Sequence, residues 1–142
     1  MSGIEIELTD PSTALVEELD ERLYEFNRAA TGIDDGEGLG AVVRGPDGEV
    51  LAAAAGHSWG GTCEIRQVWV HESLRGRGVG RGLMRAVEAE ARRRGCRQLV
   101  LGTHSFQAPG FYAKLGFEEV GRLDDYPRGH ANISLRKALR PD

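Results

Sequence analysis

The sequence predicts an α/β (α+β) fold in which a mixed, mostly antiparallel sheet of seven strands is flanked by helices on both faces. Short alternating or continuous apolar segments indicate the strands, and longer segments with apolar residues every three or four positions indicate helices. Their order is strand, helix, three strands, helix, strand, helix and two strands. The 142 residues match the length of one ordinary domain, so a single domain over residues 1–142 is expected.

The first half of the chain is expected to supply four strands and a helix. Ile4, Ile6 and Leu8 alternate with acidic or polar residues, as in a half-buried strand. Asp10 and Pro11 then favour a helix start, with Asp10 accepting hydrogen bonds from free amides. The helix should end near residues 27–32, before a polar, irregular segment over residues 30–40. The next three strands are expected at residues 40–44, 49–57 and 62–71, joined by turns at Gly45-Pro46-Asp47-Gly48 and Trp59-Gly60-Gly61.

The second half contains the clearest helix, over residues 79–94, with a core-facing apolar stripe that includes Leu83 and Val87. Three arginines and Gly95 close it, which suits the dipole and the C-terminal turn of a helix. Leu99, Val100 and Leu101 form the continuous apolar run of a strand covered on both faces. The remaining elements are expected as a helix at 109–115 and strands at 117–123 and 132–135.

Composition excludes several classes of function. The formal net charge of -4, from 18 basic and 22 acidic residues, argues against a nucleic-acid-binding surface. Cys63 and Cys96 are too few for a disulfide framework and lack a His/Cys cluster, so they are expected to be buried apolar residues, with no metal bound. The N-terminus does not resemble a signal peptide, and no apolar run is long enough to cross a membrane. A cytoplasmic protein is therefore expected.

The junction between the third central strand and the long helix has the features of a phosphate site. It contains four glycines and four arginines, namely Gly76, Gly78, Gly80, Gly82, Arg75, Arg77, Arg81 and Arg85. A helix N-terminus exposes unpaired N–H groups and a partial positive charge, and glycines let an anion approach them closely. No Ser, Thr, Asp or Asn precedes this helix as a cap, so an anionic ligand is able to take that place.

Other known phosphate-binding motifs fit the glycine-rich junction less well. The P-loop pattern is absent, and glycines at every second position differ from the dinucleotide-binding pattern, which also belongs to the first strand–helix turn of a parallel sheet. An arginine-flanked flexible turn without a ligand is an alternative of almost equal weight on these residues alone.

The segment from Val68 to Met84 resembles the acyl-CoA-binding signature of GNAT acetyltransferases, Arg/Gln-x-x-Gly-x-Gly/Ala after an apolar strand. Residues 108–117, Ala-Pro-Gly-Phe-Tyr-Ala-Lys-Leu-Gly-Phe, resemble the second signature of the same family, Ala-x-x-Phe-Tyr-x-x-x-Gly-Phe. Two signatures in the family's order are far more specific than one. The order of predicted elements also resembles that fold over nearly the whole chain.

The resemblance implies acetyl-CoA as co-substrate, held by the strand backbone along its pantetheine arm and by loop amides at its pyrophosphate. The family often has an asparagine three residues before the alanine of the second signature; here Ser105 occupies that position, with Gln107 as a substitute. The residues implied in coenzyme binding are Val68, Trp69, Val70, Arg75, Gly76, Arg77, Gly78, Val79, Gly80, Arg81, Ser105 and Gln107.

Catalysis by direct attack of an amine on a thioester needs a group that removes a proton. A primary amine with a pKa near 10.4 costs about 4 to 5 kcal/mol to neutralise at neutral pH. Glu64 is the first candidate, because we expect it on the same strand face as Val68, and it resembles the glutamate base of some histone-modifying members. His71 and His104 are weaker candidates, and an ion pair of Glu64 with Arg66 is an alternative of nearly equal weight.

Tyr112 matches the family tyrosine that faces the coenzyme sulfur and protonates the leaving thiolate. Its alternative role is that of a core aromatic residue beside Phe111 and Phe117. The resemblance therefore implies an acyltransferase with Glu64 and Tyr112 as its catalytic residues and an amine as acceptor.

The acceptor is not defined by these motifs. A mouth lined by Asp34, Asp35, Glu37, Asp124 and Asp125 favours a cationic amine, such as a polyamine, an aminoglycoside-like compound or a lysine side chain, although these acids more simply keep the protein soluble. A small molecule is the first expectation, and a protein lysine or N-terminus is the alternative. Two further hypotheses are a noncatalytic acyl-CoA sensor and a nucleotide-binding protein. A homodimer through the sheet edge is a further option.

Overall fold

A computed structural model describes residues 3–140 of the chain. The chain divides into two compact units, one up to Asp34 and one from Asp35 onward, and each is described by itself. The first contains α1 (Thr13–Thr31). The second contains β1 (Glu37–Arg44), β2 (Val50–Trp59), β3 (Thr62–Val70), the 3-10 turn η1 (Glu72–Leu74), α2 (Val79–Arg93), β4 (Gln98–His104), α3 (Pro109–Lys114), β5 (Glu118–Asp124) and β6 (Ala131–Ala138).

The first unit differs from the prediction at its start. Residues 3–12 form neither helix nor strand, so the predicted strand at Ile4, Ile6 and Leu8 is wrong and the sheet has six strands. An alternating pattern becomes a strand only when its backbone pairs with a neighbour, and no such pairing is present in residues 3–12. The helix is capped by Ser12, whose hydroxyl oxygen accepts from the Leu15 N–H at 3.2 Å, rather than by Asp10.

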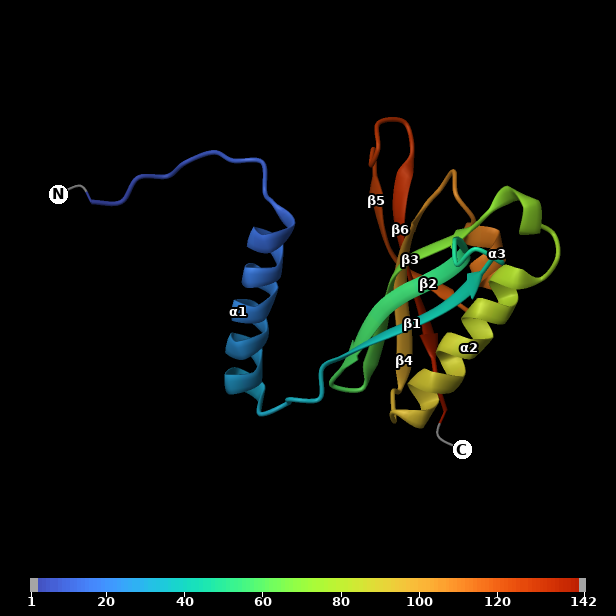
Figure 1. Cartoon of the computed structure of the whole chain (residues 1–142), viewed down its shortest axis with the longest axis horizontal. Coiled ribbons are helices and arrows are strands. Elements are labelled where there is room, and N and C mark those ends of the chain that lie inside the picture. Colours follow the sequence, from blue (N-terminus) through green and yellow to red (C-terminus); the bar gives the residue numbers. More distant parts are fainter. Residues whose placement is uncertain (1–2, 141–142) are drawn as a thin grey trace. The chain divides into compact units, whose positions relative to one another are not determined.

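The second unit is built on a six-stranded sheet with the order β1-β2-β3-β4-β6-β5 (Figure 1). Only the β3–β4 pair is parallel, and every other neighbouring pair is antiparallel. This arrangement confirms the prediction of a mixed, mostly antiparallel sheet, including the hairpin across residues 45–48 and the turn at Gly60 and Gly61. A parallel pair needs a crossover connection, and α2 provides it between β3 and β4.

A β-bulge divides β3 into two halves with opposite facing patterns. Ala55 of β2 pairs with Gln67, but the next residue, Gly56, pairs with Ile65, so Arg66 is the extra residue of the bulge. A Cβ atom on Gly56 would lie only 1.9 Å from the Glu64 carbonyl oxygen. The close approach of the two backbones at this point therefore requires glycine.

The bulge changes which side chains of β3 point toward α2. Before it, Cys63 and Ile65 are buried; after it, Val68 and Val70 pack against the buried core, while Trp69 is 48% exposed. The alternation of a regular strand is shifted by one residue, because the extra residue rotates the remainder of the strand. Glu64 therefore shares a face with Trp69 and not with Val68.

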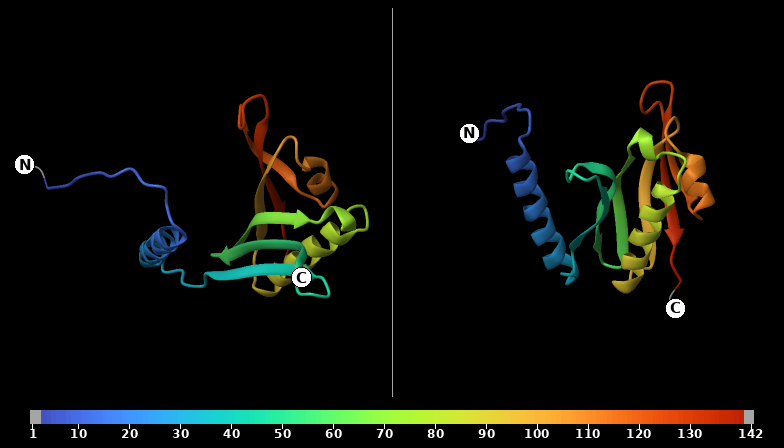
Figure 2. Two further views of the ribbon diagram at one scale, coloured as in Figure 1. Left: turned by 45° about the horizontal axis from the view of Figure 1, so that its top comes forward. Right: turned by 45° about the vertical axis from the view of Figure 1, so that its right-hand side comes forward.

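The helices α2 and α3 cover the same face of the sheet. Leu83 and Met84 of α2 and Tyr112 of α3 belong to one buried cluster, which also contains Leu99 of β4 and Leu135 of β6. Figure 2 shows α2 lying along the strands with α3 beside the β4–β6 half of the sheet. Cys63 and Cys96 are buried free cysteines, as predicted. No helix within residues 3–140 is long and apolar enough to cross a membrane.

Candidate functional site

A groove of about 530 Å³ opens where β3 ends and α2 begins. We call it the α2 groove. It is lined by the end of β3, the loop before α2, the first turn of α2 and the first turns of α3. These residues are Val68, Val70, Leu74, Arg75, Gly76, Gly78, Val79, Gly80, Arg81, Ala108, Phe111 and Tyr112. The groove brings together parts of both sequence signatures, which lie on opposite sides of β4 in the chain.

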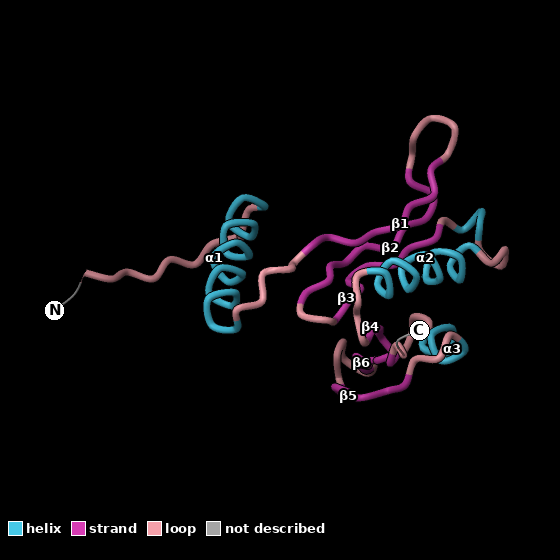
Figure 3. The backbone as a smooth tube through the Cα atoms, turned by 90° about the horizontal axis from the view of Figure 1, so that it is seen from below, coloured by secondary structure: helices cyan, strands magenta, loops and turns pink. Residues whose placement is uncertain are grey.

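The groove exists because β3 and β4 separate along their length. They pair only over Thr62–Ile65 and Gln98–Leu101, although both strands continue beyond these residues. Figure 3 shows this divergence, since β1, β2 and β3 run across the view while β4 and β6 are seen nearly end-on. Backbone groups of β3 beyond Ile65 therefore face a gap instead of a neighbouring strand, and an extended ligand is able to pair with them.

The loop before α2 presents its backbone amides to the groove. Gly76 and Gly78 have φ values of 75° and 79°, which residues with a side chain adopt only at a cost. Gly78 is the N-cap of α2, and no side chain caps the helix. The first N–H groups of this 15-residue helix are thus left for a partner from outside the chain.

The start of α2 also lies unusually close to α3. A Cβ atom on Gly80 would lie 3.3 Å from the Phe111 ring and 3.7 Å from a Val70 methyl group. Glycine at this position therefore lets the helix start, the end of β3 and the α3 aromatic residue close one end of the groove. The Gly80 that the motif predicted as an anion-binding residue thus has a packing role as well.

The positive charge around the loop is mostly unpaired. Arg75 donates its Nε hydrogen to the Val70 carbonyl at 3.2 Å, which fastens the loop to the end of β3. Arg77 and Arg81 are exposed, and neither makes a hydrogen bond or ion pair within residues 3–140. Arg81 lines the groove, whereas Arg77 does not. Together with the helix dipole these arginines make the mouth of the groove attractive to an anion.

Tyr112 is buried, with 8% of its surface exposed, and lines the groove. Its ring makes edge-to-face contacts with Phe111 and Phe117 at centroid distances of 5.0 and 5.7 Å. Burial raises the pKa of its hydroxyl above the ordinary value, because the phenolate is poorly solvated there. The hydroxyl makes no hydrogen bond within the described chain, so it remains a protonated group that is free to donate to a ligand.

The structure does not place every predicted binding residue in the groove. Trp69 is on the opposite face, and its ring packs edge-on against His71 at 5.8 Å. The Ser105 hydroxyl accepts from the Ala131 N–H at 3.0 Å. The Gln107 side-chain oxygen accepts from the His104 N–H at 2.8 Å, so this side chain stabilises its own loop. Contacts of these three residues with a coenzyme stay predictions.

Glu64 lies on the face of the sheet opposite the α2 groove, so its predicted position on the same face as Val68 is wrong. The cause is the bulge at Arg66, which no pattern of apolar residues revealed. The Glu64 carboxylate accepts from Arg66 Nε at 3.2 Å and lies 3.7 Å from Nδ1 of His57. His57 was missed in the sequence analysis, although the register of the turn at Gly60 and Gly61 pairs it with Glu64.

The two weaker histidine candidates have local structural partners. Nδ1 of His71 accepts from the Ser73 N–H at 3.0 Å and caps η1. His104 stacks on Phe106, and its Nδ1 lies 3.3 Å from the Tyr126 carbonyl oxygen. These contacts give both side chains a role in loop structure, and neither lines the groove.

The acidic residues of the second unit do not gather in one mouth. Asp35 accepts from the Gly60 N–H at 2.9 Å, and Glu37 lies beside Arg94 at the end of the sheet remote from Val70. Asp124 pairs with Arg122, and Asp125 accepts from the Gly129 N–H in the β5–β6 hairpin. These two groups lie at opposite ends of the strands, and each has a structural partner.

Comparisons with known proteins agree with this architecture. A sequence model of the acetyltransferase (GNAT) family matches residues 4–117. The chain is 30% identical over 115 residues to an acetyltransferase of Agrobacterium fabrum, covering 81% of this chain and 84% of that protein. It is 35% identical over 96 residues to the blasticidin-S acetyltransferase of Streptomyces morookaense, covering 67% of this chain and 71% of that protein.

Comparison with solved structures also indicates an acetyltransferase. The crystal structure of an acetyltransferase from Bacillus cereus ATCC 14579 superposes with a TM-score of 0.77 at 28% identity, covering 94% of this chain and 98% of that one. The sequence signatures, the strand order and the divergence of β3 from β4 thus indicate the same family. The chain belongs to the acetyltransferase (GNAT) family and is an acyltransferase.

Proposed function

We propose that the protein transfers an acetyl group from acetyl-CoA to a primary amine of a small molecule by direct attack on the thioester. The observation that carries this proposal is the α2 groove. It brings together an uncapped helix N-terminus, the end of β3 where that strand no longer pairs with β4, and Tyr112. A diphosphate, an extended amide chain and a thioester follow one another in the coenzyme in this same order.

The amides from Gly76 to Arg81 hold the pyrophosphate, and Arg75 and Arg81 add charge at the same place. The backbone of β3 beyond Ile65 pairs with the pantetheine arm, as an added strand would. Val68 then lies beside the thioester, where a backbone N–H stabilises the oxyanion that forms during attack. Most of the acceleration comes from this positioning.

The acceptor amine approaches from the face of the sheet opposite the pyrophosphate. Glu64 and His57 lie on that face, and the Glu64 carboxylate takes the proton that the attacking amine loses. Collapse of the tetrahedral intermediate breaks the carbon–sulfur bond, and the Tyr112 hydroxyl donates its proton to the departing thiolate. The products are the acetylated amine and free CoA.

A small-molecule acceptor is supported by the printed name of one relative, the blasticidin-S acetyltransferase. The acidic loop residues do not add to this support, since their carboxylates have partners in the fold. The proposal therefore defines the reaction and the amine class, and an acceptor screen has to identify the compound.

The proposal is tested by measuring release of free thiol from acetyl-CoA with a panel of amines. The panel contains nucleoside and aminoglycoside amines, a polyamine and a lysine peptide, and calorimetry measures binding of acetyl-CoA alone. We expect binding of acetyl-CoA and amine-dependent thiol release with a small amine, with one acetyl group found on the amine for each thiol released.

Other outcomes contradict the proposal in distinct ways. Binding of acetyl-CoA without thiol release for any amine indicates a sensor. Release with the lysine peptide alone indicates a protein acetyltransferase. Absence of acetyl-CoA binding removes the proposed coenzyme itself.

A further inference from the structure

A second cavity, of about 270 Å³, lies between α2, α3 and β6. We call it the basic pocket. Its charged side chains are Arg81, Arg85, Glu88, Lys114 and Lys137, and buried core residues, including Met84 and Leu99, form its floor. Arg81 also lines the α2 groove, so the two cavities meet at this residue. Neither sequence signature assigns a role to Arg85, Lys114 or Lys137.

The charges in the basic pocket do not cancel. Lys137 Nζ lies 2.6 Å from Glu88 Oε1, and Arg92 Nε lies 3.3 Å from Glu88 Oε2, so the single carboxylate is fully engaged. Burial alone would raise the pKa of Glu88, but hydrogen bonds and charge from Lys137 and Arg92 lower it overall. Arg81, Arg85 and Lys114 make no hydrogen bond or ion pair with any part of residues 3–140.

The arginines in the two halves of α2 differ in their ion-pair partners. In the second half, Arg92, Arg93 and Arg94 each pair with a glutamate on the same helix. In the first half, the position four residues after Arg81 is Arg85, a like charge at a spacing where an opposite charge stabilises a helix. The chain as a whole has a net charge of -4, so this pair of like charges is a local exception. An anion bound between Arg81 and Arg85 would offset the repulsion between them.

The position of the pocket identifies the anion. Arg85 lies one helical turn beyond Arg81, or about 6 Å along the axis at about 1.5 Å per residue. Because Arg81 lines both cavities, a coenzyme whose pyrophosphate lies at the start of α2 would have its ribose within reach of the basic pocket. The ribose of CoA carries a phosphate on its 3′ oxygen, which is doubly charged near neutral pH and accepts several charge-assisted hydrogen bonds.

We propose that the basic pocket binds the 3′-phosphate of the coenzyme through Arg81, Arg85 and Lys114. The inference rests on the proposed use of acetyl-CoA and makes it more specific. It assigns selection of CoA over 3′-dephospho-CoA, and over a thioester on pantetheine alone, mainly to Arg85 and Lys114, two residues whose identity neither signature specifies. Lys137 has a supporting role, because its ammonium group holds Glu88 and neutralises it.

Calorimetry with two ligands tests this inference, namely acetyl-CoA and acetyl-3′-dephospho-CoA. We expect the wild-type protein to bind acetyl-CoA roughly tenfold more tightly, a modest value because the cations are exposed. The variants R85A and K114A should each reduce this ratio about threefold. Their affinity for the dephosphorylated ligand should stay within about twofold of the wild-type value, because an independent contact with the 3′-phosphate is lost only when that phosphate is present.

Arg97→Ala is the matched control. Arg97 is exposed at the end of the sheet remote from Val70, and its replacement removes the same charge without touching the pocket. It should leave the ratio of the two affinities unchanged. A circular dichroism spectrum verifies that each variant is folded.

The outcomes separate this inference from the proposed function. Equal affinity of the wild-type protein for both ligands overturns the 3′-phosphate site while leaving acetyl-CoA as the coenzyme. A ratio that R97A lowers as much as R85A also overturns it, since the effect is then a general one of net charge. Binding of neither ligand overturns the inference together with the function on which it rests.

Discussion

Tyr112 shows how one residue serves both packing and chemistry. Its ring is part of the buried cluster and contacts Phe111 and Phe117, while the residue also lines the α2 groove and its hydroxyl has no hydrogen-bond partner in the described chain. The two interpretations of this residue in the sequence analysis are therefore compatible. The packing fixes the ring, and a fixed ring directs the hydroxyl to one point of the groove.

Replacing Tyr112 by Phe keeps the ring and removes the proton donor. We expect kcat to fall by about 100-fold, within the range of a lost general acid, while the affinity for acetyl-CoA stays within about twofold. Y126F, which removes an exposed hydroxyl outside the groove, is the control and should behave as the wild-type protein. An unchanged kcat in Y112F would assign Tyr112 to packing alone.

The pH dependence follows from the sign of the pKa shift at Tyr112. Burial raises the pKa of the Tyr112 hydroxyl above its ordinary value of about 10. The hydroxyl therefore stays protonated through the whole neutral range and still at about pH 10. The rate should rise with pH because the acceptor amine loses its proton, and Tyr112 should not limit this rise in the neutral range. Any fall of the wild-type rate below about pH 10 has to come from another group.

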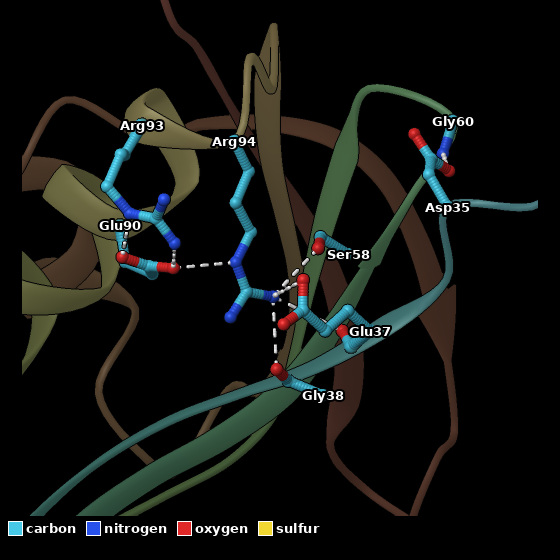
Figure 4. A network of polar contacts seen from close by, with 8 residues as sticks. All are labelled: Asp35, Glu37, Gly38, Ser58, Gly60, Glu90, Arg93 and Arg94. Atoms are coloured by element: carbon cyan, nitrogen blue, oxygen red, sulfur yellow. Dashed lines mark hydrogen bonds and ion pairs between the residues drawn. The ribbon is translucent and has the colours of Figure 1, made fainter.

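At the scale of elements, Arg94 fastens the end of α2 to the first two strands (Figure 4). Its side chain is only 15% exposed, and its Nη1 lies 3.0 Å from both the Gly38 carbonyl oxygen and the hydroxyl of buried Ser58. Its Nε donates to Glu90 at 2.8 Å. The helix is thus held at its last turn, at the opposite end from the α2 groove.

Arg94→Ala should lower the free energy of unfolding by about 1–3 kcal/mol, because it leaves a buried hydroxyl and a strand carbonyl without a donor. Urea unfolding of this variant and of R93A makes the comparison direct. The Arg93 side chain is 70% exposed and its hydrogen bonds within the described residues go to Glu90, so its removal should leave the unfolding midpoint nearly unchanged. Equal shifts in the two variants would contradict the role of the buried contacts.

At the scale of the whole molecule, an acidic protein carries a local concentration of positive charge. The formal charge is -4, yet Arg77, Arg81, Arg85 and Lys114 are all exposed around the start of α2 and have no ion-pair partner within residues 3–140. Such a distribution attracts a small polyanion at one place while leaving the remaining surface unattractive to nucleic acid.

The affinity for acetyl-CoA should consequently depend on salt. Raising NaCl from 0.05 to 0.5 M shortens the screening length and should weaken binding by roughly three- to tenfold. Acetyl-pantetheine, which lacks phosphates, is the matched ligand and should show little change, although it binds weakly. Calorimetry at several salt concentrations measures both, and a salt-independent affinity for acetyl-CoA would argue against charge as a source of binding.

Much of this architecture could be predicted from the sequence, because the informative signals are local. Gly76 and Gly78 indicate a loop that needs positive φ, and the missing cap before Val79 indicates a free helix N-terminus. The hairpin at residues 45–48 and the amphipathic pattern of α2 are equally local. The conformation of these elements is determined by residues close in sequence, so local sequence patterns are sufficient to predict them.

The errors come from contacts that a linear pattern does not contain. The face of Glu64 depends on the bulge at Arg66, which depends on how Gly56 approaches the other strand. The strand predicted at Ile4 to Leu8 requires a partner strand, which the alternating pattern alone does not supply. Lys114 and Arg85 line the same pocket because α2 and α3 pack on the same face of the sheet. Their spacing in the sequence does not indicate that they are neighbours.

The extra residue in β3 has a consequence for how such enzymes diverge. Loss of one residue at position 66 would remove the bulge and leave a regular strand, in which Cys63 and Ile65 still share a face with Val68 and Val70 while Glu64 stays on the opposite face. A bulge-free strand of unchanged length would instead place Glu64 on the face of Val68 and Val70, and the carboxylate would enter the compartment that attracts phosphate. The one extra residue thus decides between two chemically opposite arrangements of one strand, and the register of this hairpin constrains evolution as strongly as any side chain on it.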